Sequence, residues 1–103
     1  MNIQAMLKQA QAMQAKMAAV QEALKEREQT GAAGGGKVTV TMNGAHEITA
    51  IHIDPEVVRP EEADLLEDLL IAACRDVRSK VAAMVEEEMK RATGGMALPP
   101  GLF

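Results

Sequence analysis

Apolar side chains recur at alternating spacings of three and four residues over the first 24 positions of the chain. They are Ile3, Met6, Ala10, Met13, Met17, Val20 and Leu24. This is the a/d pattern of a helix that packs along one seam, sustained over about three heptads. The glycine-rich run at residues 30–36 has no large side chain to continue the seam. We therefore expect a helix over residues 1–29, followed by a hinge or loop.

After residue 36 the period of the apolar positions changes to two, which is typical of a half-buried strand. The alternating apolar residues are Val38, Val40 and Met42. Asn43 and Gly44 favour a tight hairpin turn, and a second strand follows from His46 or Glu47 to Ile53. Apolar residues fall on both faces of this second strand, which indicates either a bulge or burial on two sides. The pattern predicts a small antiparallel sheet over residues 37–53.

Prolines mark the start of a second long helix. Asp54 and Pro55 are typical of a cap followed by a short turn, and Pro60 then opens the helix. The helix carries one broad apolar stripe, formed by Leu66, Leu69, Leu70, Ala73, Cys74, Val77, Val81 and Met84. We expect it to span residues 60–92, with an extended tail at 93–103. The fold class is therefore α+β, in a single domain over residues 1–103.

These elements are too long for a compact body. Each long helix would span roughly 40 Å, whereas a compact domain of this length has a radius of gyration of about 13 Å. A two-stranded hairpin is also marginal by itself. We therefore expect helical arms that overhang the body, and a homodimer, because oligomers of this kind are most often two-fold.

Composition narrows the function. Hydrophobic residues make up 48% of the chain, but it has no Trp, no Tyr and one Phe, so base stacking on aromatic side chains is not available to it. The single cysteine, Cys74, cannot form an internal disulfide, and we expect it to be buried. The chain has no apolar run typical of a signal peptide or membrane span. These features predict a soluble cytoplasmic protein with no membrane partner.

The sequence offers little chemistry for catalysis. Ser79 is the only serine, and no motif places His46 or His52 beside it as a base. The two histidines and Cys74 are a poor set of metal ligands. We predict no enzymatic activity, cofactor, metal or small-molecule substrate. The acidic cluster of the second helix is better explained as a solvated helix start than as an acid/base site; it comprises Glu61, Glu62, Asp64, Glu67 and Asp68.

Positive charge is concentrated in two places although the net charge is −4. Two lysines are the only charged side chains before Glu22, and three cations interrupt the acidic second helix with only Asp76 among them. Side chains of this type bond phosphate oxygens without reading base sequence. The candidate phosphate contacts are Lys8, Lys16, Arg75, Arg78 and Lys80.

Several motifs, in this order and spacing, resemble the YbaB/EbfC family of nucleoid-associated proteins along nearly the whole chain. They are KQAQAMQAKM at residues 8–17, VTVTMNGAHEI at 38–48, IHIDPEVV at 51–58, EDLLIAACRDV at 67–77 and GGMALPPGLF at 94–103. The resemblance implies a homodimer whose helices project like the arms of tweezers. It also implies binding of double-stranded DNA by those arms, with low sequence preference, and a place in the nucleoid.

Two other interpretations stay open. The helical seam and the methionine-rich arms could grip another protein helix, which would make the chain a protein-interaction adaptor. Alternatively, the chain could be a small acid/base enzyme that uses the acidic cluster. The salt dependence of binding distinguishes DNA binding from the adaptor function. The affinity for DNA falls steeply as salt rises, whereas the affinity of an apolar helix interface changes little.

Overall fold

The computed structural model describes residues 2–94 and has the expected α+β class. Its order is α1 (Ile3–Lys25), β1 (Glu28–Ala33), β2 (Val38–Asn43), β3 (Ile48–Ile53), two short 3-10 turns (Pro55–Val57 and Pro60–Glu62) and α2 (Ala63–Ala92). The strands form one antiparallel sheet in the order β1-β2-β3. The short turn after Asp54 is confirmed. The predicted helix start at Pro60 is corrected, because Pro60–Glu62 forms a second 3-10 turn and α2 begins at Ala63. The predicted tail lies outside the described residues from residue 95 onwards.

The segment after the first helix corrects one expectation. α1 ends at Lys25, and Glu28–Ala33 is a strand paired with β2, where the sequence predicted a helix up to residue 29 and then a hinge or loop. The reason is close packing, because a Cβ at Gly31 would lie 2.4 Å from the backbone nitrogen of Val77. A glycine here therefore lets β1 lie directly against α2. Residues 34–37 form the turn that reaches β2, and the first three of them are glycines with positive φ.

The turn between β2 and β3 also differs from the expected tight turn at Asn43 and Gly44. The residue with positive φ is His46, at 64°. Gly44 instead packs against the end of α1, where its N–H donates to the carbonyl oxygen of Leu24 at 2.9 Å and a Cβ would meet that oxygen at 2.5 Å.

The bulge alternative for the second strand is confirmed. The register shifts between Thr41 and Met42, so that Ile48 pairs with Met42 and Ile51 with Val40. Paired residues point to the same side of a sheet. The isoleucines of β3 therefore share the face on which α2 packs. The alternative of burial on both faces does not hold within this chain, because every residue of β3 except Ile53 is exposed.

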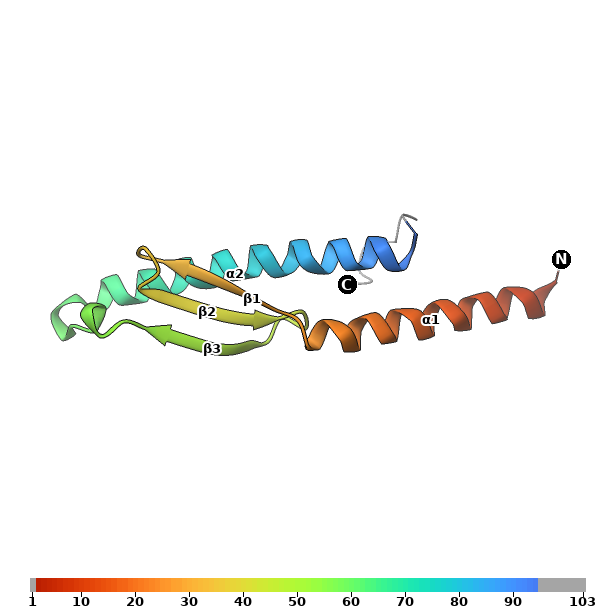
Figure 1. The fold of residues 1–103 in the computed structure, drawn as a ribbon, viewed down its shortest axis with the longest axis horizontal. Helices are drawn as coiled ribbons and strands as arrows, with labels where there is room; N and C mark the ends of the chain where they lie inside the picture. Colours follow the sequence, from red (N-terminus) through yellow and green to blue (C-terminus); the bar gives the residue numbers. More distant parts are fainter. Residues whose placement is uncertain (1, 95–103) are drawn as a thin grey trace.

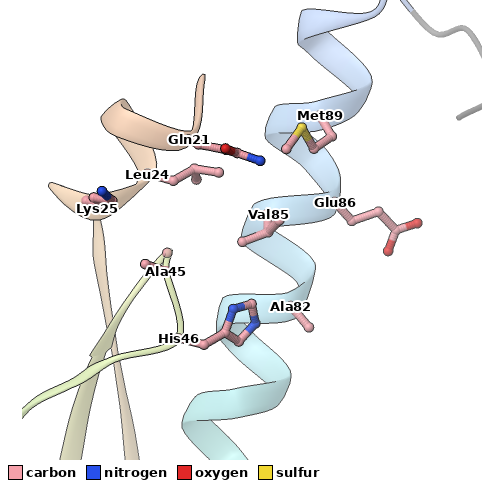
Figure 2. A pocket seen from close by; sticks show the side chains of 10 residues that line it. Gln21, Leu24, Lys25, Ala45, His46, Ala82, Val85, Glu86 and Met89 are labelled. Carbon is pink, nitrogen blue, oxygen red and sulfur yellow. The ribbon is translucent and has the colours of Figure 1, made fainter. Parts of the chain in front are cut away.

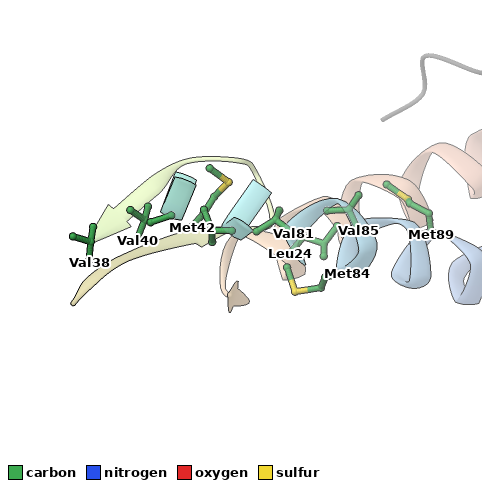
Figure 3. Packing of buried hydrophobic residues seen from close by; sticks show 10 residues of the cluster. Leu24, Val38, Val40, Met42, Val81, Met84, Val85 and Met89 are labelled. Carbon is green, nitrogen blue, oxygen red and sulfur yellow. The ribbon is translucent and has the colours of Figure 1, made fainter. Parts of the chain in front are cut away.

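The core lies between α2 and the first two strands. Val38 and Val40 are fully buried, and Figure 3 shows the row continuing through Val81 and Val85 to Met89. The predicted stripe of α2 is confirmed in its buried members Ala73, Val77, Val81 and Met84, while Leu66, Leu69, Leu70 and Cys74 pack at its edge. Cys74 is therefore half-buried rather than buried, because it lies on the margin of the stripe.

The described residues form an elongated body, as the length of the helices predicted. Its extents are 70 × 21 × 17 Å and its radius of gyration is 19.0 Å. Figure 1 shows α1 antiparallel to the second half of α2, with its first turns projecting beyond the end of α2. Along the α1 seam, Leu24 is buried and Met17 and Val20 touch the core, whereas Ile3 is 68% exposed. The outer half of the seam is left uncovered by the other residues of the described range 2–94.

Candidate nucleic-acid interface

Four of the five predicted phosphate contacts are cations with no carboxylate partner. Lys8, Lys16, Arg75 and Arg78 are exposed and form no ion pair or side-chain hydrogen bond within residues 2–94. Lys80 differs, because its Nζ lies 3.3 Å from Asp76 Oδ2 and donates to the Thr30 carbonyl oxygen at 3.1 Å. Lys80 therefore ties α2 to β1.

Asp76 lies between the two arginines in sequence but does not neutralise them. Its Oδ2 accepts a hydrogen bond from the backbone N–H of Ala32 in β1 at 2.9 Å. That hydrogen bond, and then the bond to Lys80, hold the pKa of the Asp76 carboxyl below its usual value. Because the Asp76 carboxylate faces β1, it does not neutralise the guanidinium groups of Arg75 and Arg78, which lie on the other side of the helix.

The two arginines line a surface hollow of about 330 Å³ together with His46, Ser79 and Ala82. His46 and Ala82 also line a second, larger groove of about 650 Å³ between the end of α1, the turn at residues 43–47 and α2. Figure 2 shows Leu24, Val85 and Met89 facing this groove. A cationic hollow and an apolar groove therefore adjoin each other along α2.

The structure does not bring the lysines of α1 next to the arginines of α2. Leu24 and Val85 line the same groove, and the two helices run antiparallel (Figure 1). With about 1.5 Å per helical residue, Lys16 and Arg75 are roughly 27 Å apart along the long axis. Lys8 lies about 12 Å further out. The positive charges therefore form two patches that are separated along the long axis of the molecule.

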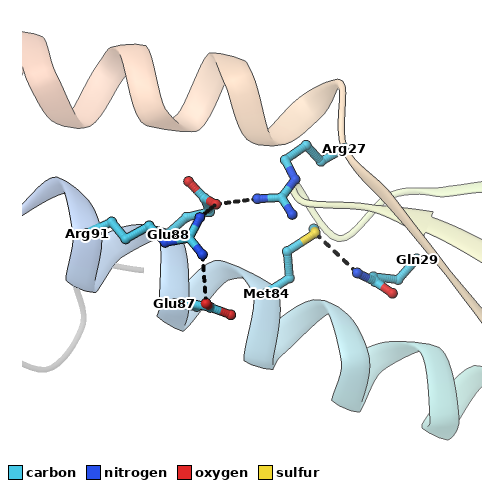
Figure 4. A network of polar contacts seen from close by, with 6 residues as sticks. All are labelled: Arg27, Gln29, Met84, Glu87, Glu88 and Arg91. Atoms are coloured by element: carbon cyan, nitrogen blue, oxygen red, sulfur yellow. Dashed lines mark hydrogen bonds and ion pairs between the residues drawn. The ribbon is translucent and has the colours of Figure 1, made fainter.

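The remaining cations of the chain, with one exception, are paired with carboxylates. Figure 4 shows Arg27, just after α1, bound to Glu88 of α2, while Arg91 Nη2 lies 2.8 Å from Glu87 Oε1. The contact between Arg27 and Glu88 braces the end of α1 against α2, whereas the pair of Arg91 and Glu87 lies within α2. Lys25, Lys37 and Lys90 are paired in the same way.

The exception is Arg59, an exposed cation that the sequence analysis missed. It forms no ion pair within residues 2–94. It lies between the two 3-10 turns, outside both helices. A cluster of cations on a helix, which indicated the other candidate contacts, does not include this isolated arginine.

The described residues contain no group of three or more His, Cys, Asp or Glu side chains arranged to hold a metal ion. Over the same residues, neither helix is both long enough and apolar enough to cross a membrane. What the exposed side chains of the two patches offer is fixed positive charge and N–H donors. Such groups attract polyanions and bond phosphate oxygens.

The fold and the two patches together define a class: small elongated α+β proteins that present unpaired cations on long helices. Within that class, the chain belongs to the YbaB/EbfC DNA-binding family, whose model matches residues 1–96. This is a DNA-binding family rather than a family of enzymes.

Individual relatives agree with this membership. A nucleoid-associated protein of Granulibacter bethesdensis is 46% identical over 101 residues, which cover 98% of this chain and 94% of that protein. A nucleoid-associated protein of Rhodospirillum rubrum matches with the same identity and coverage. The crystal structure of an uncharacterised Helicobacter pylori protein superposes with a TM-score of 0.71 at 26% identity, covering 93% of this chain and 97% of that one.

Proposed function

We propose that this protein is a nucleoid-associated protein of the cytoplasm that binds duplex DNA as a homodimer with low sequence preference. Lys8, Lys16, Arg75 and Arg78 contact backbone phosphates, and Lys80 contributes less because Asp76 and Thr30 hold its ammonium group. The observation that carries the proposal is that four exposed helical cations lack carboxylate partners within residues 2–94. Phosphate contacts of this type give affinity that does not depend on sequence.

The homodimer is supported by an uncovered apolar face. α2 packs on β1 and β2, so the side of β3 that continues this face stays open, with Ile48 50% and Ile51 52% exposed. A second copy of the chain would bury these side chains, and burial of apolar area is the main favourable term in association. A dimer also presents each cationic patch twice, which raises the avidity of weak contacts.

The adaptor is the second candidate, and the exposed outer half of α1 favours it. Ile3, Met6 and Leu7 are 68%, 56% and 57% exposed. Side chains at this spacing suit an apolar helix-in-groove contact. Binding to a partner helix through them would change little with salt, whereas binding to DNA would weaken steeply.

The test removes the arginine pair and measures the salt dependence of DNA binding. Arg75→Gln and Arg78→Gln are combined, and affinity for several unrelated duplexes is measured at several salt concentrations. Each lost phosphate contact should weaken binding to all duplexes alike and reduce the log-log salt slope by about 0.9. Lys8→Gln with Lys16→Gln should act in the same way.

A matched control removes two positive charges that already have carboxylate partners. Lys37 pairs with Glu56 at 2.7 Å and Lys90 with Glu86 at 3.4 Å. The combination of Lys37→Gln and Lys90→Gln should leave most of the salt slope intact. If both unpaired-cation variants are folded by circular dichroism and bind DNA like the parent with an unchanged slope, the proposed contacts are wrong.

A further inference from the structure

The turn between β2 and β3 places a histidine against the arginine pair. His46 lies in this turn, and Figure 2 shows its ring beside Ala82 of α2. The hollow that His46 lines also contains Arg75, Arg78 and Ser79. One hollow is therefore lined by residues that carry two guanidinium groups, an imidazole and a hydroxyl, and that come from two elements far apart in the sequence.

This turn is held firmly by one buried side chain. Asn43 Oδ1 accepts hydrogen bonds from the backbone N–H groups of Ala45 and Glu47, at 2.9 and 3.0 Å, and its Nδ2 donates to Glu47 Oε1 at 3.1 Å. The N–H of His46 donates to the Asn43 carbonyl oxygen at 3.0 Å. His46 is thereby kept in the left-handed backbone region, which residues other than glycine rarely adopt and which is often found at functional sites.

The charges around His46 favour an anion. Arg75 and Arg78 are one helical turn apart and repel each other, and the carboxylate of Asp76 faces β1. The adjoining groove, which His46 also lines, contains two charged residues, Lys25 of α1 and Glu86 of α2. Lys25 pairs with Glu22, and Glu86 with Lys90. The hollow itself thus has positive charge without a compensating carboxylate among its lining residues.

The size of the hollow suits a phosphate group. A volume of about 330 Å³ is many times the roughly 30 Å³ that one water molecule takes up in the liquid. A phosphodiester and its waters therefore fit between the turn and α2. Arginine bonds phosphate oxygens through two parallel N–H groups, and neutral donors beside it fix the orientation.

We propose that His46 completes a phosphate clamp, in which Arg75 and Arg78 supply the charge while the His46 imidazole N–H and the Ser79 hydroxyl donate hydrogen bonds to the same backbone phosphodiester of duplex DNA. This inference rests on the proposed function, because it deepens the role of the arginine pair. It adds the turn at residues 43–47 to the DNA-binding surface and fixes which side of α2 faces the duplex.

The first experiment replaces the histidine while keeping the turn. His46→Asn removes the imidazole, and asparagine tolerates the left-handed backbone. We expect affinity for all duplexes to fall about tenfold, the size expected for a lost hydrogen bond to a charged group. The matched control is His52→Asn, because His52 is an exposed histidine on the sheet and lines neither cavity. It should bind within about twofold of the parent. If the asparagine variant unfolds, His46→Gly serves in its place.

The second experiment tests whether His46 and the arginines hold one phosphate. His46→Asn is combined with Arg75→Gln in a double-mutant cycle. When two residues bind the same phosphate, the fold-loss of DNA affinity in the double variant is smaller than the product of the two single fold-losses. A coupled loss is therefore expected. Independent losses, or a folded His46→Asn variant that binds like the parent, would overturn the clamp. A parent protein that binds no duplex would instead overturn the proposed function itself.

The third experiment distinguishes the DNA backbone from free phosphate. The ring C–H signals of the two histidines are followed by NMR while either a duplex or inorganic phosphate is added. The His46 signals should shift with the duplex while those of His52 do not, and inorganic phosphate should act only at much higher concentration. Saturation by inorganic phosphate at the concentration at which the duplex acts would refute the assignment to the DNA backbone.

Discussion

Gly31 is the position at which a single added methyl group should disturb the fold most directly. A Cβ there would lie 2.4 Å from the nitrogen of Val77, 2.5 Å from the carbonyl oxygen of Ala73 and 2.8 Å from the Cα of Val77. All three atoms belong to the backbone of α2, so no side-chain rotation can relieve the contact. Gly31→Ala must therefore push α2 away from β1.

The cost can be estimated from overpacked cores, where extra methylene groups destabilise by about 1 to 3 kcal/mol. We expect the upper part of this range, because α2 supplies Ala73, Val77 and Val81 to the core, each fully buried. For a domain of this size, 2 to 3 kcal/mol corresponds to a fall in Tm of roughly 10 to 20 °C. Thermal unfolding followed by circular dichroism measures it, at one fixed protein concentration because oligomers unfold in a concentration-dependent way.

The neighbouring residue provides the control. Ala32 is exposed, and its side chain points to the face of the sheet opposite Gly31. Ala32→Ser keeps the backbone N–H that bonds Asp76 and should change stability by less than about 0.5 kcal/mol. A Gly31→Ala protein that unfolds at the temperature of the parent would show that β1 and α2 are not in direct backbone contact.

Three further outcomes follow from the structure. Ile51→Glu places a carboxylate on the open apolar face of β3 and should prevent the dimer from forming. Light scattering should then report a mass near 11.0 kDa, where the parent gives about twice that value. An unchanged dimer would exclude this face as the interface. Cys74 is half-buried, so a thiol reagent should label it slowly in the native protein. Cys74→Ala should lower the stability of the protein while DNA binding persists. Rapid labelling would contradict the place of Cys74 at the edge of the core. The pKa of the Asp76 carboxyl is lowered by the N–H of Ala32 and by Lys80. The ionised carboxylate therefore stabilises the fold above about pH 4, and this stabilisation is lost as the pH falls through the lowered pKa. The difference in unfolding free energy between the parent and Asp76→Asn should shrink below about pH 4, and a constant difference would refute the stabilising role of the Asp76 carboxylate.

Much of the architecture followed from periodicity alone. The seam of α1, the alternation along β2 and the stripe of α2 each predicted the right element, because a helix and a strand repeat their buried faces at 3.6 and 2.0 residues respectively. The overhang of the helices followed as well, since element length is a local property of the chain. The structure confirms it with a long axis of 70 Å.

β1 could not be read from its own residues. Gly31 and its small neighbours look like a loop by composition, and the strand exists because β2 pairs with it and α2 lies on it. His46 was likewise missed as part of the hollow. Its left-handed backbone and its approach to α2 depend on the hydrogen bonds that Asn43 accepts from the backbone of the turn, and on the packing of the turn.

The sequence by itself determined which cations the chain carries and on which helices they lie. Only the tertiary structure decided which of them are free to meet a phosphate. Asp76 is the sequence neighbour of Arg75 and lies four residues before Lys80, and its carboxylate bonds Lys80 together with the backbone N–H of Ala32 in β1. Arg75 has no carboxylate partner among the described residues. Helical spacing alone favours the pairing of Asp76 with Lys80 over Arg75, but it cannot supply the second bond, because that backbone N–H comes from 44 residues away and reaches Asp76 only when β1 packs against α2.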